Sequence, residues 1–115
     1  LCLVSSSVFA QTVDLGDLYS RYEQADFSSM ELPEYNQTIA FQAVIVSSEQ
    51  NLEGGALLEI GSVQDPETTL ARITPADSEA AKFAKLKSGQ KVKLECNVEM
   101  TMGSDYLGLG DCTLK

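Results

Sequence analysis

The chain has 115 residues, of which 43% are hydrophobic and 22% charged, and its net charge is −9. This length suits one small globular domain and leaves no room for two. No apolar run reaches the ~20 residues that a membrane-spanning helix needs. The sequence contains no histidine, which removes the commonest general base and the commonest zinc ligand.

The first ten residues, LCLVSSSVFA, are uncharged and end in Val8-Phe9-Ala10 before Gln11. Small residues at these spacings are typical of a signal-peptide cleavage site, so we expect residues 1–10 to be a signal-peptide remnant. The mature chain would then be one exported domain, residues 11–115, in the periplasm or outside the cell. An N-terminal strand, or a lipoprotein lipidated at Cys2, is the alternative.

Residues 14–25 predict a helix with one apolar stripe and with Asp14 as its cap. The stripe includes Tyr19 and Tyr22, for which core packing is favoured over a stacking platform. Residues 26–37 are irregular and contain a glycosylation sequon at Asn36, which matters only in a eukaryotic secreted protein.

Period-two patterns predict strands at 38–46, 56–63 and 69–73, with a polar loop at 47–55 and a turn at 65–67. A second helix is expected from Thr74, as its cap, to Lys87, with Pro75 in the first helical position. The expected buried stripe of this helix is Ala76, Ala80, Phe83 and Ala84. Lysines crowd its C-terminal end, where they would complement the helix dipole.

Residues 91–100 show the clearest alternation in the chain, with Cys96, Val98 and Met100 on the apolar side. Residues 106–114 form the returning strand. A three-residue loop at 103–105 would set Cys96 directly opposite Cys112.

A two-residue loop at 103–104 instead sets Leu107 opposite Met100 and Leu109 opposite Val98, and a bulge at Gly110–Asp111 then brings the cysteines together. Both registers predict a disulfide, which is also the simplest use of two cysteines in an exported protein.

The order of elements is helix, three strands, helix, two strands. This order predicts a mainly β protein, a five-stranded OB-fold-like Greek-key barrel preceded by an N-terminal helix. An open α+β sandwich is the competing arrangement.

From about Leu18 onward the chain resembles the periplasmic tRNA_anti-like OB-fold proteins. The matching pieces are LYSRY in the first helix, EAAKFAKLKSGQKVKLEC across the second helix and fourth strand, and the closing LGDCTL. The resemblance implies an OB barrel, and its name suggests nucleic-acid binding, but a fold does not fix a function. The chain departs from the pattern at Ala43 and Cys96, where small, glycine-like residues are expected.

OB-folds usually bind ligands on the face of the second and third strands, beside the loop between the last two strands. Nucleic acid there needs stacked aromatic rings and a positive groove. The second and third predicted strands contain no Phe, Tyr or Trp, and Arg72 is their only basic residue, among acidic neighbours such as Glu59. We therefore expect nucleic-acid binding to be unlikely, and keep single-stranded nucleic acid or oligosaccharide on this face as the alternative function.

The sequence shows no nucleophile–base pair and no metal motif, so we expect neither an enzyme nor a cofactor. The favoured function is an exported, non-catalytic binding or interaction module whose partner is a protein, a peptide or a small ligand. Arg72, Met102 and Tyr106 are the expected ligand contacts. Copper or silver binding by Met100 and Met102 is a further hypothesis, for which two thioethers form an incomplete ligand set.

Overall fold

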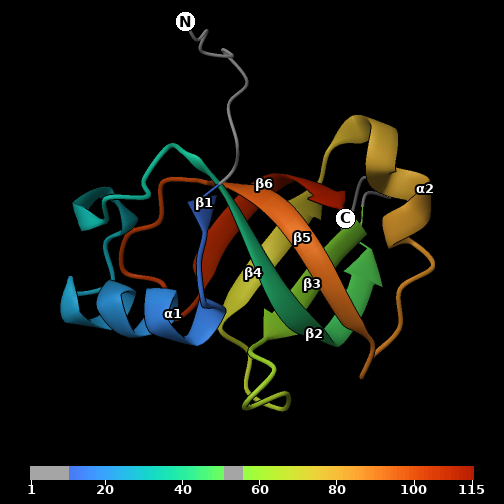
Figure 1. Ribbon diagram of the computed structural model, residues 1–115, viewed down its shortest axis with the longest axis horizontal. Helices are drawn as coiled ribbons and strands as arrows, with labels where there is room; N and C mark the ends of the chain where they lie inside the picture. Colours follow the sequence, from blue (N-terminus) through green and yellow to red (C-terminus); the bar gives the residue numbers. More distant parts are fainter. Residues whose placement is uncertain (1–10, 51–55) are drawn as a thin grey trace, which may run out of the picture.

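The computed structural model describes residues 11–50 and 56–115. The elements in chain order are β1 (Gln11–Thr12), α1 (Leu15–Gln24), η1 (Ser29–Glu31), β2 (Thr38–Gln50), β3 (Ala56–Gly61), β4 (Ala71–Pro75), η2 (Asp77–Glu79), α2 (Ala80–Phe83), β5 (Lys91–Val98) and β6 (Leu107–Leu114) (Figure 1). The expected signal peptide at 1–10 and residues 51–55 of the expected polar loop lie outside the described residues.

Five strands close into a barrel in the order β2-β3-β4-β6-β5, because β5 pairs back onto β2. β4 and β6 run parallel, and the other neighbours in the barrel are antiparallel. This is the Greek-key arrangement of the OB-fold. The predicted fold class, a five-stranded barrel preceded by a helix, is confirmed.

Strand β2 is shared between two partners. Its first half pairs with β5, from Thr38 opposite Asn97 to Val44 opposite Lys91, and its second half pairs with β3. The strand changes partner near Ile45, where the register shifts. Ser47–Gln50 was expected to be loop and is strand instead, since pairing with β3 overrides the weak strand preference of polar residues.

Helix α1 has the predicted cap, since the Asp14 carboxylate accepts the Asp17 N–H at 2.9 Å. Its stripe residues Leu15, Leu18 and Tyr22 are buried in the core, and Tyr22 meets Phe27 edge-on at 5.6 Å between ring centroids. Burial of Tyr22 confirms core packing for this tyrosine.

The second helix is far shorter than expected. Strand β4 continues through Pro75, which pairs with Cys112, so Thr74 caps nothing and Pro75 opens no helix. The Ala76 N–H donates to the Cys112 carbonyl, and the Glu79 carboxylate accepts the Leu114 N–H. These bonds to β6 hold the segment where a helix would have continued.

What remains is a 3₁₀ turn followed by a single four-residue helical turn. Phe83 and Leu86 are buried in the core, whereas Ala80 and Ala84 are exposed and Ala76 is half-buried. The expected alanine stripe and the role of the lysines on a helix dipole were therefore wrong.

The β5–β6 pair follows the second of the two predicted registers. Val98 lies opposite Leu109, and the register shifts before Glu95 meets Thr113. The extra residue is Asp111, whose φ of 53° marks the predicted bulge. The predicted tight turn was wrong, because residues 99–106 form a longer β5–β6 loop, and Met100 is 64% exposed instead of packed inward.

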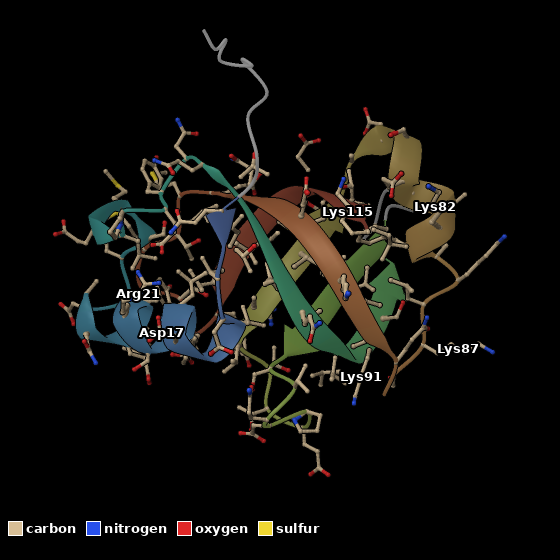
Figure 2. The ribbon with its side chains drawn as sticks, viewed as in Figure 1. Asp17, Arg21, Lys82, Lys87, Lys91 and Lys115 are labelled. Carbon is tan, nitrogen blue, oxygen red and sulfur yellow. A yellow bond between two sulfur atoms is a disulfide. The ribbon has the colours of Figure 1, made fainter. Side chains whose placement is uncertain are left out.

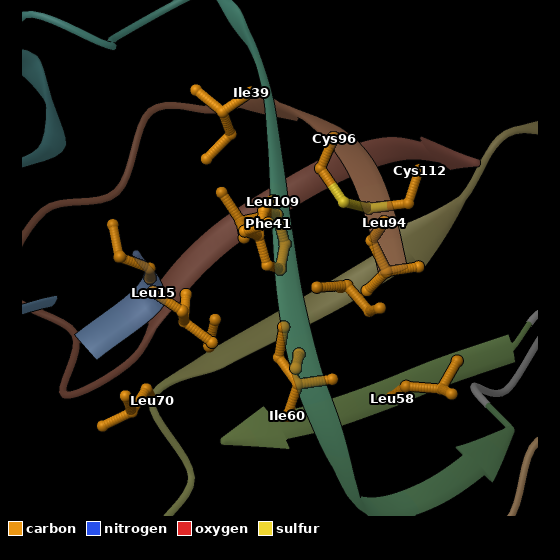
Figure 3. Packing of buried hydrophobic residues seen from close by; sticks show 14 of the residues in the cluster. Leu15, Ile39, Phe41, Leu58, Ile60, Leu70, Leu94, Cys96, Leu109 and Cys112 are labelled. Atoms are coloured by element: carbon orange, nitrogen blue, oxygen red, sulfur yellow. A yellow bond between two sulfur atoms is a disulfide. The ribbon is translucent and has the colours of Figure 1, made fainter. Parts of the chain in front are cut away.

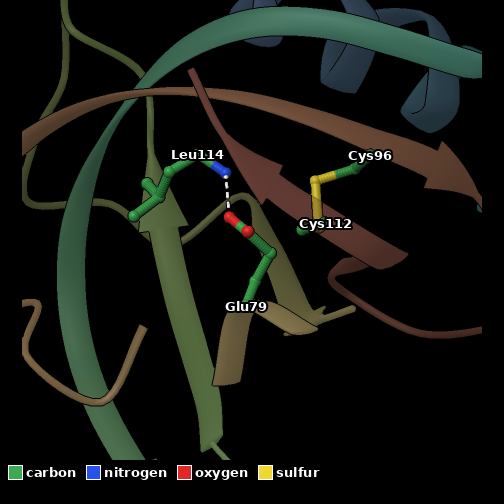
Figure 4. Close-up of a disulfide and its surroundings, with 4 residues drawn as sticks. All are labelled: Glu79, Cys96, Cys112 and Leu114. Carbon is green, nitrogen blue, oxygen red and sulfur yellow. Dashed lines mark hydrogen bonds between the residues drawn. A yellow bond between two sulfur atoms is a disulfide. The ribbon is translucent and has the colours of Figure 1, made fainter. Parts of the chain in front are cut away.

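The disulfide joins Cys96 to Cys112 across this bulge, with 4.2 Å between the two Cα atoms. Both cysteines are fully buried and belong to the core, where Figure 3 shows them beside Leu94 and Leu109. Figure 4 shows the Glu79–Leu114 hydrogen bond in the same region. The predicted disulfide is thus part of the end of the barrel that η2 covers.

Arg21 ties α1 to the segment that leads into β2. Its guanidinium donates two hydrogen bonds, of 2.9 and 2.8 Å, to the carboxylate of Glu34, which is 3% exposed. A third bond, 3.1 Å long, reaches the exposed Asp17 one turn earlier (Figure 2). The hydrogen bonds from Arg21 lower the pKa of Glu34.

Replacing Cys96 and Cys112 together by alanine should lower the free energy of unfolding by about 3 kcal/mol, because the crosslink restricts the unfolded chain. Urea unfolding in a Cys2→Ser background measures this loss, with Cys2→Ser alone as the control. In that control the unreduced, unfolded protein should contain no free thiol, and two free thiols would contradict the disulfide.

Glu34→Gln should lower the free energy of unfolding at neutral pH by about 1–3 kcal/mol, since it removes charge-assisted bonds to a buried acceptor. A carboxyl whose pKa is lowered by folding stabilises the fold above its unfolded pKa. This contribution is lost as pH falls through the folded pKa. The wild type should therefore lose more stability than Glu34→Gln on acidification below about pH 5.

Asp17→Asn is the matched control, because it removes the exposed partner of the same arginine and should cost less than about 1 kcal/mol. Equal stability of Glu34→Gln and wild type at neutral pH, or parallel losses in acid, would argue against the role of Glu34.

Candidate functional site

A polar row crosses the outer face of β2, β3 and β4, the face on which OB-folds usually bind ligands. Ser47 lies opposite Glu59, and Glu59 lies opposite Arg72. The Glu59 carboxylate accepts bonds from the Ser47 hydroxyl at 3.3 Å and from Arg72 Nε at 3.2 Å. Thr69 adds a third bond to the same carboxylate, at 3.4 Å. Glu59 is therefore the centre of the row.

Arg72 also lies over an aromatic ring. Its guanidinium carbon is 4.5 Å from the ring centroid of Tyr106, which stands at the end of the β5–β6 loop. The Arg72 side chain is 50% exposed, while that of Glu59 is 24% exposed. A cation held between a carboxylate and a ring keeps one orientation while part of it stays open to solvent.

The structure thus brings together Arg72 and Tyr106, two of the three residues expected to contact a ligand. The third, Met102, forms an antiparallel bridge with Ser28 and belongs to the part of the loop beside η1. From the sequence, Glu59 was expected only to be an acidic residue near Arg72. The alternation in β3 predicts that it faces outward, but its pairing with Arg72 depends on the turn between β3 and β4.

Helix α1 holds the β5–β6 loop through hydrogen bonds from two tyrosine hydroxyls. The Tyr22 hydroxyl donates to the Ser104 carbonyl at 2.6 Å, and the Tyr19 hydroxyl donates to the Asp105 carbonyl at 2.7 Å. Burial raises the pKa of both tyrosines, and Glu23 raises that of Tyr19 further. The Ser104 hydroxyl then accepts the Tyr106 N–H at 3.1 Å. The position of Tyr106 therefore depends on the helix that precedes the barrel.

Two glycines of β6 let the start of this loop lie against the barrel. A Cβ on Gly108 would stand 2.9 Å from the Thr101 hydroxyl, which accepts the Gly108 N–H. A Cβ on Gly110 would overlap the Glu99 carboxylate. The loop thus covers the face of β6 beside Arg72 and carries an acidic group there.

Positive charge gathers on a different face of the barrel. Lys91 and Lys93 are exposed on β5, where it pairs with β2. The Nζ atom of Lys115, which follows β6, lies 3.5 Å from the carboxylate of Glu95 in β5. Figure 2 labels Lys91 and Lys115. A hollow of about 480 Å³ is lined by these three lysines, by Gln42 and Gln90, and by apolar side chains that include Leu86. In the barrel, β6 lies between β5 and β4, the strand of Arg72.

Within residues 11–50 and 56–115, no group of three or more Cys, Asp or Glu side chains could hold a metal ion. In the same part of the chain, no helix has the length and apolar character needed to cross a membrane.

No family model matches the sequence, and no curated protein matches it. Among solved structures, the chain is similar to the "putative nucleic acid-binding lipoprotein" of Klebsiella pneumoniae, with a TM-score of 0.71. The match covers 92% of this chain and 92% of that one, at 15% identity. At this identity the likeness shows the fold, and the resemblance to the tRNA_anti-like family stays a prediction.

Tyr22→Phe should loosen the β5–β6 loop, because it removes the bond to Ser104 and leaves a carbonyl without that donor. The free energy of unfolding should fall by about 1 kcal/mol. Hydrogen exchange should quicken at the amides of Gly103 and Tyr106, with Tyr19→Phe as a comparison at a less buried hydroxyl. Unchanged exchange in Tyr22→Phe would show that the helix does not hold the loop.

Proposed function

We propose that this chain is an exported, non-catalytic binding module whose ligand contacts the outer face of β3 and β4 at Arg72 and Tyr106. One observation carries the proposal. The only arginine of these strands is fixed across a tyrosine ring by Glu59 and stays half-exposed on the face where OB-folds usually bind ligands. A side chain that is held before binding loses less conformational entropy when the ligand arrives.

The chemistry of this face supports binding over catalysis. Glu59 is the carboxylate at its centre, and it already accepts bonds from Arg72, Ser47 and Thr69. These contacts make Glu59 a group that positions Arg72. The row offers hydroxyl, carboxylate and guanidinium groups, which suit the hydrogen-bonding groups of an oligosaccharide or a peptide.

The disulfide supports export. Disulfides persist in oxidising compartments and are rare in the cytosol, and Cys96 and Cys112 are bonded within the core. A periplasmic or secreted location is part of the proposal.

Single-stranded nucleic acid is the second candidate ligand, because the Klebsiella pneumoniae lipoprotein of similar fold is named for nucleic-acid binding. The Arg72 face offers little for a phosphate backbone, since its arginine is paired with Glu59. The lysines of β5 would be the positive groups for such a ligand. The two candidates therefore predict different contact surfaces.

Binding of immobilised oligosaccharides, peptides and labelled single-stranded DNA to the full chain tests these alternatives. For the Arg72 face, we expect an oligosaccharide or peptide to bind, and Arg72→Gln to weaken that binding about tenfold, a loss of about 1.4 kcal/mol. Lys91→Gln with Lys93→Gln is the matched control on the other face and should leave binding unchanged.

Salt-sensitive DNA binding that is lost in the lysine variant, and not in Arg72→Gln, would overturn the proposal in favour of the second candidate. Failure of every ligand class to bind the wild type would also count against a binding module.

A further inference from the structure

The chain contains three methionines, and the fold leaves all of them on the surface. Met30 is 49% exposed, Met100 64% and Met102 67%, and they are the exposed large apolar side chains of the described residues. The leucines and isoleucines of the described barrel and helices are buried or half-buried. Each exposed large apolar side chain of the described residues is therefore a methionine.

Backbone pairing brings these methionines together from distant parts of the sequence. Ser28 and Met102 form an antiparallel bridge, flanked by bonds from the Ser29 N–H to Thr101 O, at 2.9 Å, and from the Gly103 N–H to Phe27 O, at 2.8 Å. The pairing ends at Ser29, whose hydroxyl accepts the Thr101 N–H, and Met30 follows as the next residue in η1. Figure 1 shows the loop running beside η1 at the end of the molecule away from α2.

The residues between the methionines face the protein. Ser29 is fully buried, and its hydroxyl donates to Glu99 O at 2.8 Å and accepts the Thr101 N–H at 2.7 Å. Thr101 is half-buried and bonds to Gly108. Met100 and Met102 flank Thr101, and Met30 follows Ser29 in η1, so three exposed methionine side chains adjoin the two residues that bond to each other.

We propose that Met30, Met100 and Met102 form a thioether site for a soft monovalent ion, Cu⁺ or Ag⁺. Thioether sulfur is a soft ligand that selects Cu⁺ over harder ions. The sequence offered Met100 and Met102 as an incomplete pair, and the fold supplies the third sulfur. The site lies apart from Arg72 and is independent of the function proposed for that face.

The surroundings favour a cation over an apolar partner at this site. Glu31, the next residue after Met30, is exposed. A net charge of −9 attracts cations to the protein as a whole.

The direct test is a titration of the full chain, in a Cys2→Ser background, with Ag⁺. NMR signals of the ¹³C-labelled methionine methyl groups are recorded during the titration. Cys2→Ser prevents that thiol from competing for the metal. The methyl signals of Met30, Met100 and Met102 should shift together and stop shifting at one Ag⁺ per chain. Single Met→Leu variants assign the signals.

Competition with a chromophoric Cu⁺ chelator measures the affinity. Each of Met30→Leu, Met100→Leu and Met102→Leu should weaken Cu⁺ binding at least tenfold, a change of about 1.4 kcal/mol. Leu keeps the bulk and removes the sulfur, so thermal unfolding should stay near that of the parent protein. Arg72→Gln is the matched control, with unchanged Cu⁺ affinity, and Zn²⁺ should not shift the methyl signals.

Shifts of fewer than three methyl signals, or shifts that continue without a defined stoichiometry, would overturn the proposal. Binding that survives every single Met→Leu change would do the same. In either case an apolar docking surface for another protein would be the better interpretation of this patch.

Discussion

The fold depends on one strand that serves two partners. β2 pairs with β5 along its first half and with β3 along its second half, so the barrel can close only if β2 bends between them. The register shift after Ile45 provides that change of direction. Closure leaves no free edge between β2 and β5, and it fixes which outer faces of the barrel lie apart. The separation of the Arg72 row from the lysines of β5 follows from this closure.

Closure also decides what the β5–β6 loop can reach. β6 runs parallel to β4 and is the antiparallel neighbour of β5, so the loop that joins β5 to β6 lies at one end of the barrel. The missing side chains of Gly108 and Gly110 allow the loop to approach β6 closely. α1 and η1 then hold its two halves, with Tyr22 bonded to Ser104 and Ser29 bonded to Thr101. The same loop thereby carries Tyr106 to one surface and Met100 and Met102 to another.

The sequence predicted those features that depend on neighbours along the chain. The capped helix α1, the alternation of β5 and the glycine-marked bulge before Cys112 all follow from local patterns, and the bulge gave the register of the disulfide. The helix expected from Thr74 failed because its backbone and Glu79 bond to β6, a strand more than thirty residues later. Local propensity is a weak guide where such distant bonds compete.

The candidate sites show the same limit. Arg72 and Tyr106 could be named from their places in an OB barrel, but their contact depends on a β4–β6 pairing that no local pattern indicates. Met30 could not be added to Met100 and Met102, because the bridge that joins Ser28 to Met102 spans most of the chain. In both cases the residue types were visible in the sequence, and the tertiary pairing that gives them a shared surface was not.

The chain uses its two arginines for different purposes, although each is paired with a glutamate. Arg21 binds a carboxylate that is 3% exposed, so removing the arginine would leave a buried charge without its partner, and the pair serves the fold. Arg72 is half-exposed and its carboxylate is partly open, so solvent screens their attraction and the pair adds little stability. Its effect is to hold the guanidinium across Tyr106. A surface pair that contributes little to the fold but fixes an exposed guanidinium serves recognition, and this makes the Arg72 face the better place for a ligand.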